Sequence, residues 1–132
     1  MIKGLAHACY VVKDLAAAER FYCGALGLKP AFEFKDETRG KFGVYLKVGP
    51  RAFIELFIGE TEPAPKASYR HICLEVDDLT AEVARLRKAG LTVTDPKLGK
   101  DQSWQSWISD PDGNAIELHQ YTAASWQTPH IS

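Results

Sequence analysis

The chain contains an internal repeat, and this repeat constrains the fold more than any other feature of the sequence. HACYVVKDL (His7–Leu15) is matched later by HICLEVDDL (His71–Leu79), and both read His-x-Cys-x-x-Val-x-Asp-Leu. At nearly the same distance after each of them comes a segment containing Ile-Glu-Leu, PRAFIELF (Pro50–Phe57) and PDGNAIELH (Pro111–His119). Self-similarity of this kind indicates two copies of one supersecondary unit.

Each copy is predicted to place a helix directly after its opening strand. The patterns AAAERFYCGALG and TAEVARLRKAG are helical and end in Gly27 and Gly90, residues suited to helix ends. Asp14 and Asp78 precede the helices, where a short carboxylate can accept hydrogen bonds from free backbone N–H groups. The two helices are therefore expected to begin and end in the same way.

Between the helix and the closing strand, each half has room for two more strands. We expect these strands at about Ala31–Lys35, Lys41–Val48, Thr92–Thr94 and Ser103–Ser109. The predicted fold class is therefore α+β, a single domain of two paired βαβββ modules at about residues 5–58 and 69–121. The connecting segment, at about 59–68, is rich in Pro and charge, as is typical of a linker.

Composition excludes several classes of protein. With 132 residues, the chain can form one domain with a core but is too short for two independent domains. A net charge of −1 provides no basic surface for nucleic acid, and the apolar runs are too short to cross a membrane. The first residues lack a signal-peptide pattern, and the three cysteines have no C-x-x-C spacing, so we expect a cytoplasmic protein with reduced thiols.

Strand alternation predicts that four polar residues lie on the uncovered faces of the two modules. Side chains alternate between the two faces of a strand, and the aliphatic rows are suited to being covered by a helix. The residues on the opposite faces are His7, Glu55, His71 and Glu117. If the two modules pair around a cavity, these four side chains converge there.

Two imidazoles and two carboxylates form a candidate metal site. This donor set binds divalent first-row metals and selects weakly among Ni, Zn, Co, Mn and Fe. Such a metal acts as a Lewis acid on a substrate oxygen, and a carboxylate beside it can act as a base. The alternative is that these residues are structural, in a chain that keeps the architecture and binds no metal.

Five other residues are weaker candidates. Phe53 is expected to form an apolar pocket wall, Trp104 to line the cavity, and His119 to contact the substrate or support Glu117. Each of the three has an alternative role in packing, either in the core or between modules. Cys9 and Cys73 follow the two histidines on the same faces, and we interpret them as small apolar filling rather than as thiolate ligands.

These motifs resemble the vicinal oxygen chelate superfamily, which includes glyoxalase I, extradiol dioxygenases, methylmalonyl-CoA epimerase, and fosfomycin and bleomycin resistance proteins. The resemblance rests on four segments of the sequence, HACYVVKDLAAAERFYCGALGLKP, FIELF, RHICLEVDDL and DPDGNAIELHQY. The resemblance covers nearly the whole chain, from His7 to about Tyr121. It implies two paired βαβββ modules, each an open half-barrel, with a metal between them.

Within this superfamily, the order His, Glu, His, Glu resembles glyoxalase I. The resemblance implies that His7, Glu55, His71 and Glu117 bind the metal, and that Glu117, with Glu55, moves the proton between two substrate carbons. It also implies a homodimer in which each module pairs with the other module of the partner chain; pairing of the two modules within one chain is the alternative. Extradiol dioxygenases and fosfomycin resistance proteins typically use three protein ligands, so Glu55 counts against both. A drug-binding protein of the bleomycin resistance type typically lacks the metal set.

Two positions depart from the glyoxalase I pattern. Bacterial glyoxalase I commonly has an Arg and an Asn, which help to hold glutathione, where this chain has Val11 and Gly59. Both changes remove groups suited to the glutathione backbone. The resemblance therefore leaves open whether the substrate is a glutathione–methylglyoxal hemithioacetal or another small oxygenated molecule.

Overall fold

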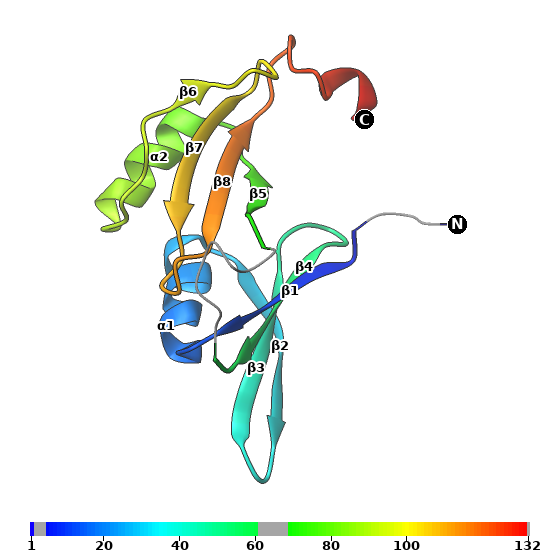
Figure 1. Cartoon of the computed structure of the whole chain (residues 1–132), viewed down its shortest axis with the longest axis vertical. Helices are drawn as coiled ribbons and strands as arrows, with labels where there is room; N and C mark the ends of the chain where they lie inside the picture. Colours follow the sequence, from blue (N-terminus) through cyan, green and yellow to red (C-terminus); the bar gives the residue numbers. More distant parts are fainter. Residues whose placement is uncertain (2–4, 61–68, 132) are drawn as a thin grey trace. The chain divides into compact units, whose positions relative to one another are not determined.

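The computed structural model describes residues 1, 5–60 and 69–131. They fall into two compact units, Met1–Ala67 and Ser68–Ser132, and each unit has the strand and helix order of a βαβββ module (Figure 1). The predicted α+β class and the order of elements in both modules are thereby confirmed. Most of the predicted linker, residues 61–68, lies outside the described residues. That the two modules share one cavity stays a prediction.

The first unit contains a four-stranded mixed sheet. Its elements are β1 (His7–Val12), α1 (Leu15–Glu19), the π-helical segment η1 (Arg20–Ala25), β2 (Lys29–Asp36), β3 (Gly40–Lys47) and β4 (Phe53–Ile58). The strand order is β1-β4-β3-β2, in which β1 and β4 are parallel and the other neighbours are antiparallel. The opening and closing strands of the module therefore lie side by side.

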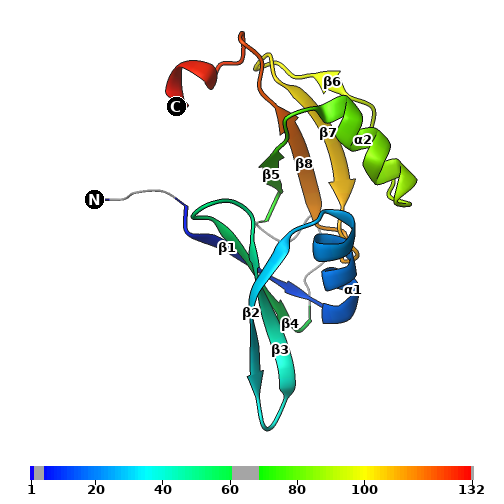
Figure 2. The same ribbon diagram turned by 180° about the vertical axis from the view of Figure 1, so that it is seen from behind.

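The second unit repeats this topology. Its elements are β5 (Ile72–Glu75), α2 (Leu79–Lys88), β6 (Lys97–Leu98), β7 (Trp104–Ser109), β8 (Ala115–Gln120) and the 3₁₀ helix η2 (Thr128–His130). The strand order is β5-β8-β7-β6, again with the first pair parallel. Both ribbon views show α2 lying along one face of this sheet (Figures 1 and 2).

The predicted helix signals are confirmed in both units. The side chain of Asp14 accepts a hydrogen bond from the backbone N–H of Ala17 at 3.0 Å, and Asp78 accepts one from Ala81 at 2.9 Å. Gly27 and Gly90 end the helical segments with φ of 76° and 93°, values that a residue without Cβ adopts at little cost. The helices begin and end where the local sequence predicts.

The strand predicted at Thr92–Thr94 is wrong, because the second strand of this module is β6, at Lys97–Leu98. Thr94 does lie beside β7, and its backbone N–H donates to the carbonyl of Trp107 at 3.1 Å. However, the N–H of Trp107 donates to the Thr94 hydroxyl, at 2.8 Å, rather than to a backbone carbonyl. Pro96 follows and has no N–H to donate, so a regular ladder cannot form there.

Each sheet buries one face and leaves the other open. In β4, Ile54 and Leu56 are buried while the alternate residues Phe53, Glu55 and Phe57 are partly exposed. In β8, Ile116 and Leu118 are buried and Glu117 is partly exposed, but His119 is buried as well. The aliphatic core of each module thus lies between the sheet and its helix, as the alternation predicts. The buried hydrophobic residues are Val12, Leu15, Ala18, Phe21, Tyr22, Val44, Leu46, Ile54 and Leu56 in the first unit, and Leu79, Val83, Leu86, Val93, Ile108, Ile116 and Leu118 in the second.

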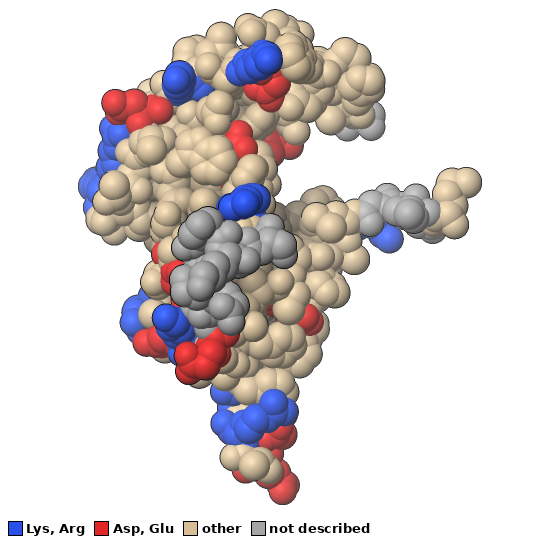
Figure 3. Space-filling model, viewed as in Figure 1, with Lys and Arg blue, Asp and Glu red and all other residues tan. Residues whose placement is uncertain are grey.

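The charged side chains are distributed without a dominant sign. On the face shown in Figure 3, acidic and basic residues are interspersed, in agreement with the net charge of −1. Among the described residues, no helix is long and apolar enough to cross a membrane.

Candidate functional site

The open face of each sheet carries an equivalent set of four side chains. In the first module Glu55 lies between Cys9 of β1 and Tyr45 of β3, its register partners. In the second module the register partners of Glu117 are Cys73 of β5 and Trp107 of β7. Register partners share a face of the sheet. The fourth member of each set is the histidine two residues before the cysteine, which is His7 in the first module and His71 in the second. The two modules are therefore alike in the arrangement of these side chains as well as in sequence.

In the first set, a tyrosine orients the imidazole. The hydroxyl of Tyr45 lies 3.0 Å from Nδ1 of His7, and the two rings meet edge-on at 5.7 Å. Nε2 of His7 lies 3.9 Å from Oε1 of Glu55. Because Nδ1 already has a partner, Nε2 is the nitrogen left available to bind a ligand.

In the second set, the imidazole and carboxylate lie closer together. Nε2 of His71 is 3.3 Å from Oε2 of Glu117, and the ring of Trp107 meets the imidazole edge-on at 4.9 Å. The side chain of Glu117 is only 14% exposed, whereas that of His71 is 39% exposed. A carboxylate is thus held in a largely shielded position beside an accessible imidazole.

The two cysteines act as hydrogen-bond donors toward the glutamates. Burial, together with the hydrogen bond to Glu55 and its negative charge, raises the pKa of Cys9 to about 11. Burial and the charge of Glu117 raise the pKa of Cys73 to about 12. Both thiols are therefore protonated at neutral pH and donate to the carboxylates. This role is more specific than the apolar filling expected from the sequence.

His119 adds a fifth side chain to the second set only. It is buried, and its Nδ1 lies 3.0 Å from Oε1 of Glu117, so His119 supports Glu117 as one of its predicted roles requires. Ligand atoms of Cys73, Glu117 and His119 lie within 4.8 Å of one another. With the thiol protonated and the imidazole directed at Oε1, this cluster surrounds the carboxylate with hydrogen-bond donors.

The residues of each pair are suited to a divalent metal ion. Ligand atoms at about 2.0–2.2 Å from one metal lie roughly 3 Å from each other. The 3.3 Å separation in the second module is close to this value, and the 3.9 Å separation in the first is reached by a small side-chain movement. Imidazole nitrogen with carboxylate oxygen is also a donor set that such metals accept.

Of the two predicted aromatic contacts, the structure brings one to an open face. Phe53 lies on the Glu55 face of β4 and stacks on Tyr45 with ring centroids 4.9 Å apart. Trp104 lies on the other face of its sheet, beside the start of α2, where it shares a shallow pocket with Leu79 and Thr80. Trp107 occupies the position opposite Glu117 instead.

Sequence reasoning missed Tyr45 as a site residue, and it chose Trp104 rather than Trp107 to line the cavity. Tyr45 and Trp107 stand at the same register position of the repeat, opposite Glu55 and Glu117 respectively. The sequence contains a usable signal, because an aromatic residue occurs at the corresponding place in both third strands. Reading it requires the strand register, which pattern alone does not provide.

The open face of the first sheet is lined with aromatic rings. Phe34 packs against Phe57 with centroids 4.9 Å apart, and Phe42 stacks on Phe57 at 6.0 Å. The ring of Phe57 also lies over Gly43, where an added Cβ would come within 2.5 Å of it. This part of the open face is therefore apolar and closely packed beside His7 and Glu55.

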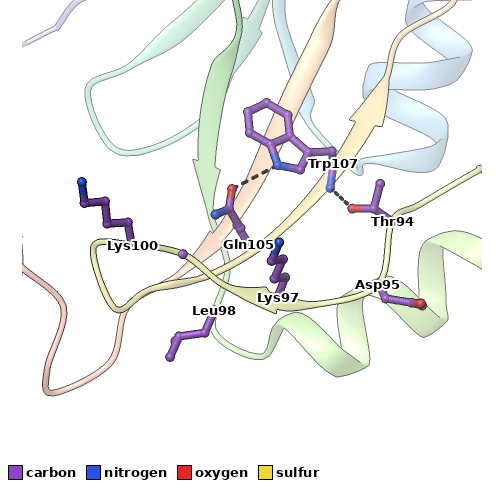
Figure 4. A pocket seen from close by; sticks show the side chains of 8 residues that line it. Thr94, Asp95, Lys97, Leu98, Lys100, Gln105 and Trp107 are labelled. Atoms are coloured by element: carbon purple, nitrogen blue, oxygen red, sulfur yellow. Dashed lines mark hydrogen bonds between the residues drawn. The ribbon is translucent and has the colours of Figure 1, made fainter.

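A pocket of about 410 Å³ lies at the edge of the second sheet (Figure 4). Trp107 and Gln105 line it and are joined by a hydrogen bond of 3.1 Å from the indole N–H to the amide oxygen. Lys97 and Lys100 add two ammonium groups, while Asp95, at the pocket edge, is paired with Arg87. The pocket therefore combines an aromatic wall with two cations, and Trp107 connects it to the open face of the sheet that carries Glu117.

The fold is that of a known family. Residues 4–118 match the family model of the Glyoxalase/Bleomycin resistance protein/Dioxygenase superfamily, and the chain belongs to this superfamily. Its members generally use divalent metal ions, and they include many enzymes as well as non-enzymatic proteins. The resemblance expected from the sequence is thereby confirmed.

Individual relatives differ in what they do. The chain is 31% identical to an ethylmalonyl-CoA/methylmalonyl-CoA epimerase of Cereibacter sphaeroides, over 91% of the chain and 99% of the relative. It is 28% identical to the fosfomycin resistance protein FosX of Mesorhizobium japonicum, over 92% of the chain and 88% of the relative. Among solved structures it resembles TnmS3, an antibiotic binding protein from Streptomyces sp. CB03234, with a TM-score of 0.73, 27% identity, and coverage of 92% and 98%. Similarity of this level does not distinguish among these activities.

Proposed function

We propose that the protein is a metal-dependent lyase or isomerase of the glyoxalase I type, acting on a small oxygenated substrate. In this proposal His7, Glu55, His71 and Glu117 bind one divalent metal ion. The supporting observation is that both modules direct an imidazole Nε2 toward a shielded glutamate at the same position of the repeat. Two histidines with independent structural roles would not be expected to share this arrangement.

Glu117 is the proposed base. Its Oε1 is held by His119 and its Oε2 faces His71, so its position on the open face is defined on two sides. When bound, the metal would polarise a substrate oxygen and so acidify the adjacent C–H group. Glu117 accepts the proton from that carbon and returns it to the neighbouring carbon.

The substrate is proposed to extend from the open face that carries Glu117 into the pocket beside Trp107. Lys97 and Lys100 suit a carboxylate or another anionic group, and the indole suits an apolar body. At the Val11 and Gly59 positions the chain lacks the groups that hold glutathione in bacterial glyoxalase I. Hemithioacetals of glutathione are therefore one candidate substrate among small oxygenated anions.

We further propose that the protein forms a homodimer in the cytoplasm. Members of the superfamily are often dimers. A two-fold dimer in which each site takes one His/Glu pair from each chain would contain two equivalent sites. In the alternative, both modules of one chain form a site, and a hybrid dimer of two chains that each lack one His/Glu pair would contain no complete site.

The decisive experiment is anaerobic reconstitution followed by assay. The apo-protein is loaded separately with Ni, Zn, Co, Mn and Fe(II), and each form is tested on a glutathione–methylglyoxal hemithioacetal and on a panel of catechols. We expect one equivalent of metal for each set of four ligands, and isomerase turnover that Glu117→Gln abolishes while the fold is preserved. Glu37→Gln, in the turn between β2 and β3, is the matched control and should leave turnover unchanged.

Two outcomes would redirect the proposal. Oxygen uptake with a catechol would indicate an extradiol-type dioxygenase, the second candidate. Failure to bind any of these metals would contradict the proposal, and tight binding of an aromatic drug regardless of chelator would then favour a sequestering protein, as the likeness to the antibiotic-binding structure suggests.

A further inference from the structure

The two modules differ in the residue that follows each glutamate by two positions. In the first module this residue is Phe57, whose ring packs over Gly43. In the second module it is His119, which is only 6% exposed although it is polar. A buried imidazole requires polar partners, whereas a phenyl ring does not. The repeat therefore diverges beside Glu117 in a way that simple packing does not explain.

His119 holds one oxygen of Glu117. Nδ1 lies 3.0 Å from Oε1, and an ionised carboxylate can only accept hydrogen bonds, so Nδ1 carries the proton and donates it. The other oxygen, Oε2, is then the one that faces Nε2 of His71 at 3.3 Å. The hydrogen bond thus determines which oxygen of Glu117 is presented to the predicted metal position.

The far side of the imidazole is bounded by Asp101. Nε2 of His119 lies 3.9 Å from Oδ2 of Asp101 and has no hydrogen-bond partner among the described residues. The same Oδ2 accepts a hydrogen bond from the side-chain amide of Gln127 at 2.7 Å, which holds the pKa of Asp101 below its usual value. The backbone N–H of Ser103 donates to Oδ1 at 3.2 Å. Asp101 is therefore an oriented, ionised carboxylate.

The segment that follows β8 fixes the loop that carries Asp101. Gln102, in this loop, has a positive φ of 66°, a conformation that costs free energy in a residue other than glycine. The carbonyl of Gln102 accepts a hydrogen bond from the Thr122 hydroxyl at 2.7 Å, and the backbone N–H of Trp126 donates to the carbonyl of Asp101 at 3.0 Å. A segment without a strong sequence pattern thus stabilises the loop beside the site.

We propose that His119 is a positioning residue that presents Glu117 to the metal and the substrate, and that Asp101 and Gln127 hold it in place. The effect of this orientation on catalysis rests on the proposed function, but the orientation itself can be measured in the apo-protein. It also explains why the two glutamates of the repeat are not equivalent. Glu117 lies beside the buried imidazole of His119, whereas Glu55 lies beside the packed ring of Phe57.

The test compares His119→Leu with His119→Asn in the full-length protein. Leu and Asn are nearly isosteric, and both remove the ring, but only the amide of Asn can donate near the Nδ1 position. Binding of Co(II) is measured together with its visible absorption spectrum, which reports the geometry of the ligands. His130→Leu, in η2 near the C-terminus, is the control.

We expect His119→Leu to weaken Co(II) binding by about 10–100-fold and to change the spectrum, as loss of support behind a ligand does. His119→Asn should recover most of the Co(II) affinity and the wild-type spectrum. Gln127→Ala should change the affinity and the spectrum in the same direction as His119→Leu, but by a smaller amount. The proposal would be overturned if the Leu and Asn variants had the same Co(II) affinity and spectrum, whether these equal the wild-type values or are both impaired.

A second measurement does not depend on metal. In the apo-protein, ¹⁵N NMR of the histidine side chains should show that Nδ1 of His119 is protonated and hydrogen-bonded. An unprotonated Nδ1 would overturn the inference even if metal binds. If wild type binds no Co(II) but Nδ1 is protonated and hydrogen-bonded to Glu117, the proposed function fails while the orientation of Glu117 by His119 stands.

Discussion

Nε2 of His71 lies 3.3 Å from Oε2 of Glu117, whereas the equivalent atoms of His7 and Glu55 are 3.9 Å apart. The two pairs occupy the same register positions of a duplicated module, so the difference arises from their surroundings. Glu117 is held from behind by His119, whereas the residue at the equivalent position beside Glu55 is Phe57, which has no group to donate a hydrogen bond. The second module thus has the more preorganised half of the proposed metal site.

The first prediction tests whether the proposed site combines residues of two chains. One variant lacks the first pair (His7→Ala with Glu55→Gln), and the other lacks the second pair (His71→Ala with Glu117→Gln). Each homodimer alone should fail to bind metal tightly. A hybrid dimer, purified through two different affinity tags, should recover one intact site and bind one ion, measured by elemental analysis. A hybrid that binds no metal would show that both pairs of a site come from one chain.

The second prediction distinguishes the two tryptophans of β7. The indole of Trp107 lies 4.9 Å from the imidazole of His71, while Trp104 lies on the opposite face of the sheet and is 40% exposed. Binding of Co(II) or Ni(II) should quench tryptophan fluorescence in wild type and in Trp104→Phe, and the quenching should be largely lost in Trp107→Phe. Quenching that disappears with Trp104 instead would place the metal elsewhere.

The third prediction concerns the close approach of Gly43 and Phe57. In Gly43→Ala, the new Cβ would lie 2.5 Å from Cδ1 of Phe57 and 2.9 Å from the backbone oxygen of Leu56. We expect the free energy of unfolding to fall by about 1–3 kcal/mol, because the ring is packed against Phe34 and Phe42 and the oxygen belongs to a strand paired on both sides. Urea denaturation measures this loss.

The matched control is Gly24→Ala, since nothing lies within 4 Å of the Cβ position of Gly24, which is in the helical segment η1. This substitution should be neutral or stabilise by up to about 1 kcal/mol. If the two substitutions change the denaturation midpoint equally, the close packing of Phe57 on Gly43 is contradicted.

The fourth prediction concerns pH and Tyr69. Its hydroxyl donates to the carbonyl of Ala115 at 2.9 Å and accepts the backbone N–H of Ile72 at 3.1 Å, so it ties β5 to β8. Tyr69→Phe should lower the free energy of unfolding by about 0.5–1.5 kcal/mol. Burial raises the pKa of Tyr69 above its ordinary value of 10.0.

The sign of the pH effect follows from this raised pKa. Below pH 10 the hydroxyl is protonated in both the folded and the unfolded chain, and its full contribution is present. As the pH rises through 10 toward the folded-state pKa, the unfolded chain loses its proton first, and stability falls. Denaturation at several pH values should therefore show a steeper alkaline decline in wild type than in Tyr69→Phe. Parallel declines would show that the hydroxyl is not buried in this way.

Local signals predicted much of the fold correctly. The caps at Asp14 and Asp78 and the glycine ends at Gly27 and Gly90 depend only on neighbouring residues, and all four are confirmed. Alternation within single strands also predicted that the buried rows are aliphatic. The predicted strand at Thr92–Thr94 failed because its pairing depends on a partner strand, and the Thr94 hydroxyl replaces the backbone acceptor there.

The sequence by itself determined the duplicated βαβββ order and the face on which each His and Glu lies, because both follow from short-range periodicity and capping. Only the tertiary structure decided which residues stand beside the glutamates. Tyr45 and Trp107 reach them through antiparallel register, and Asp101 reaches His119 through a loop held by the following segment. Register and loop position depend on contacts between residues far apart in the chain, and a local pattern carries no information about such contacts.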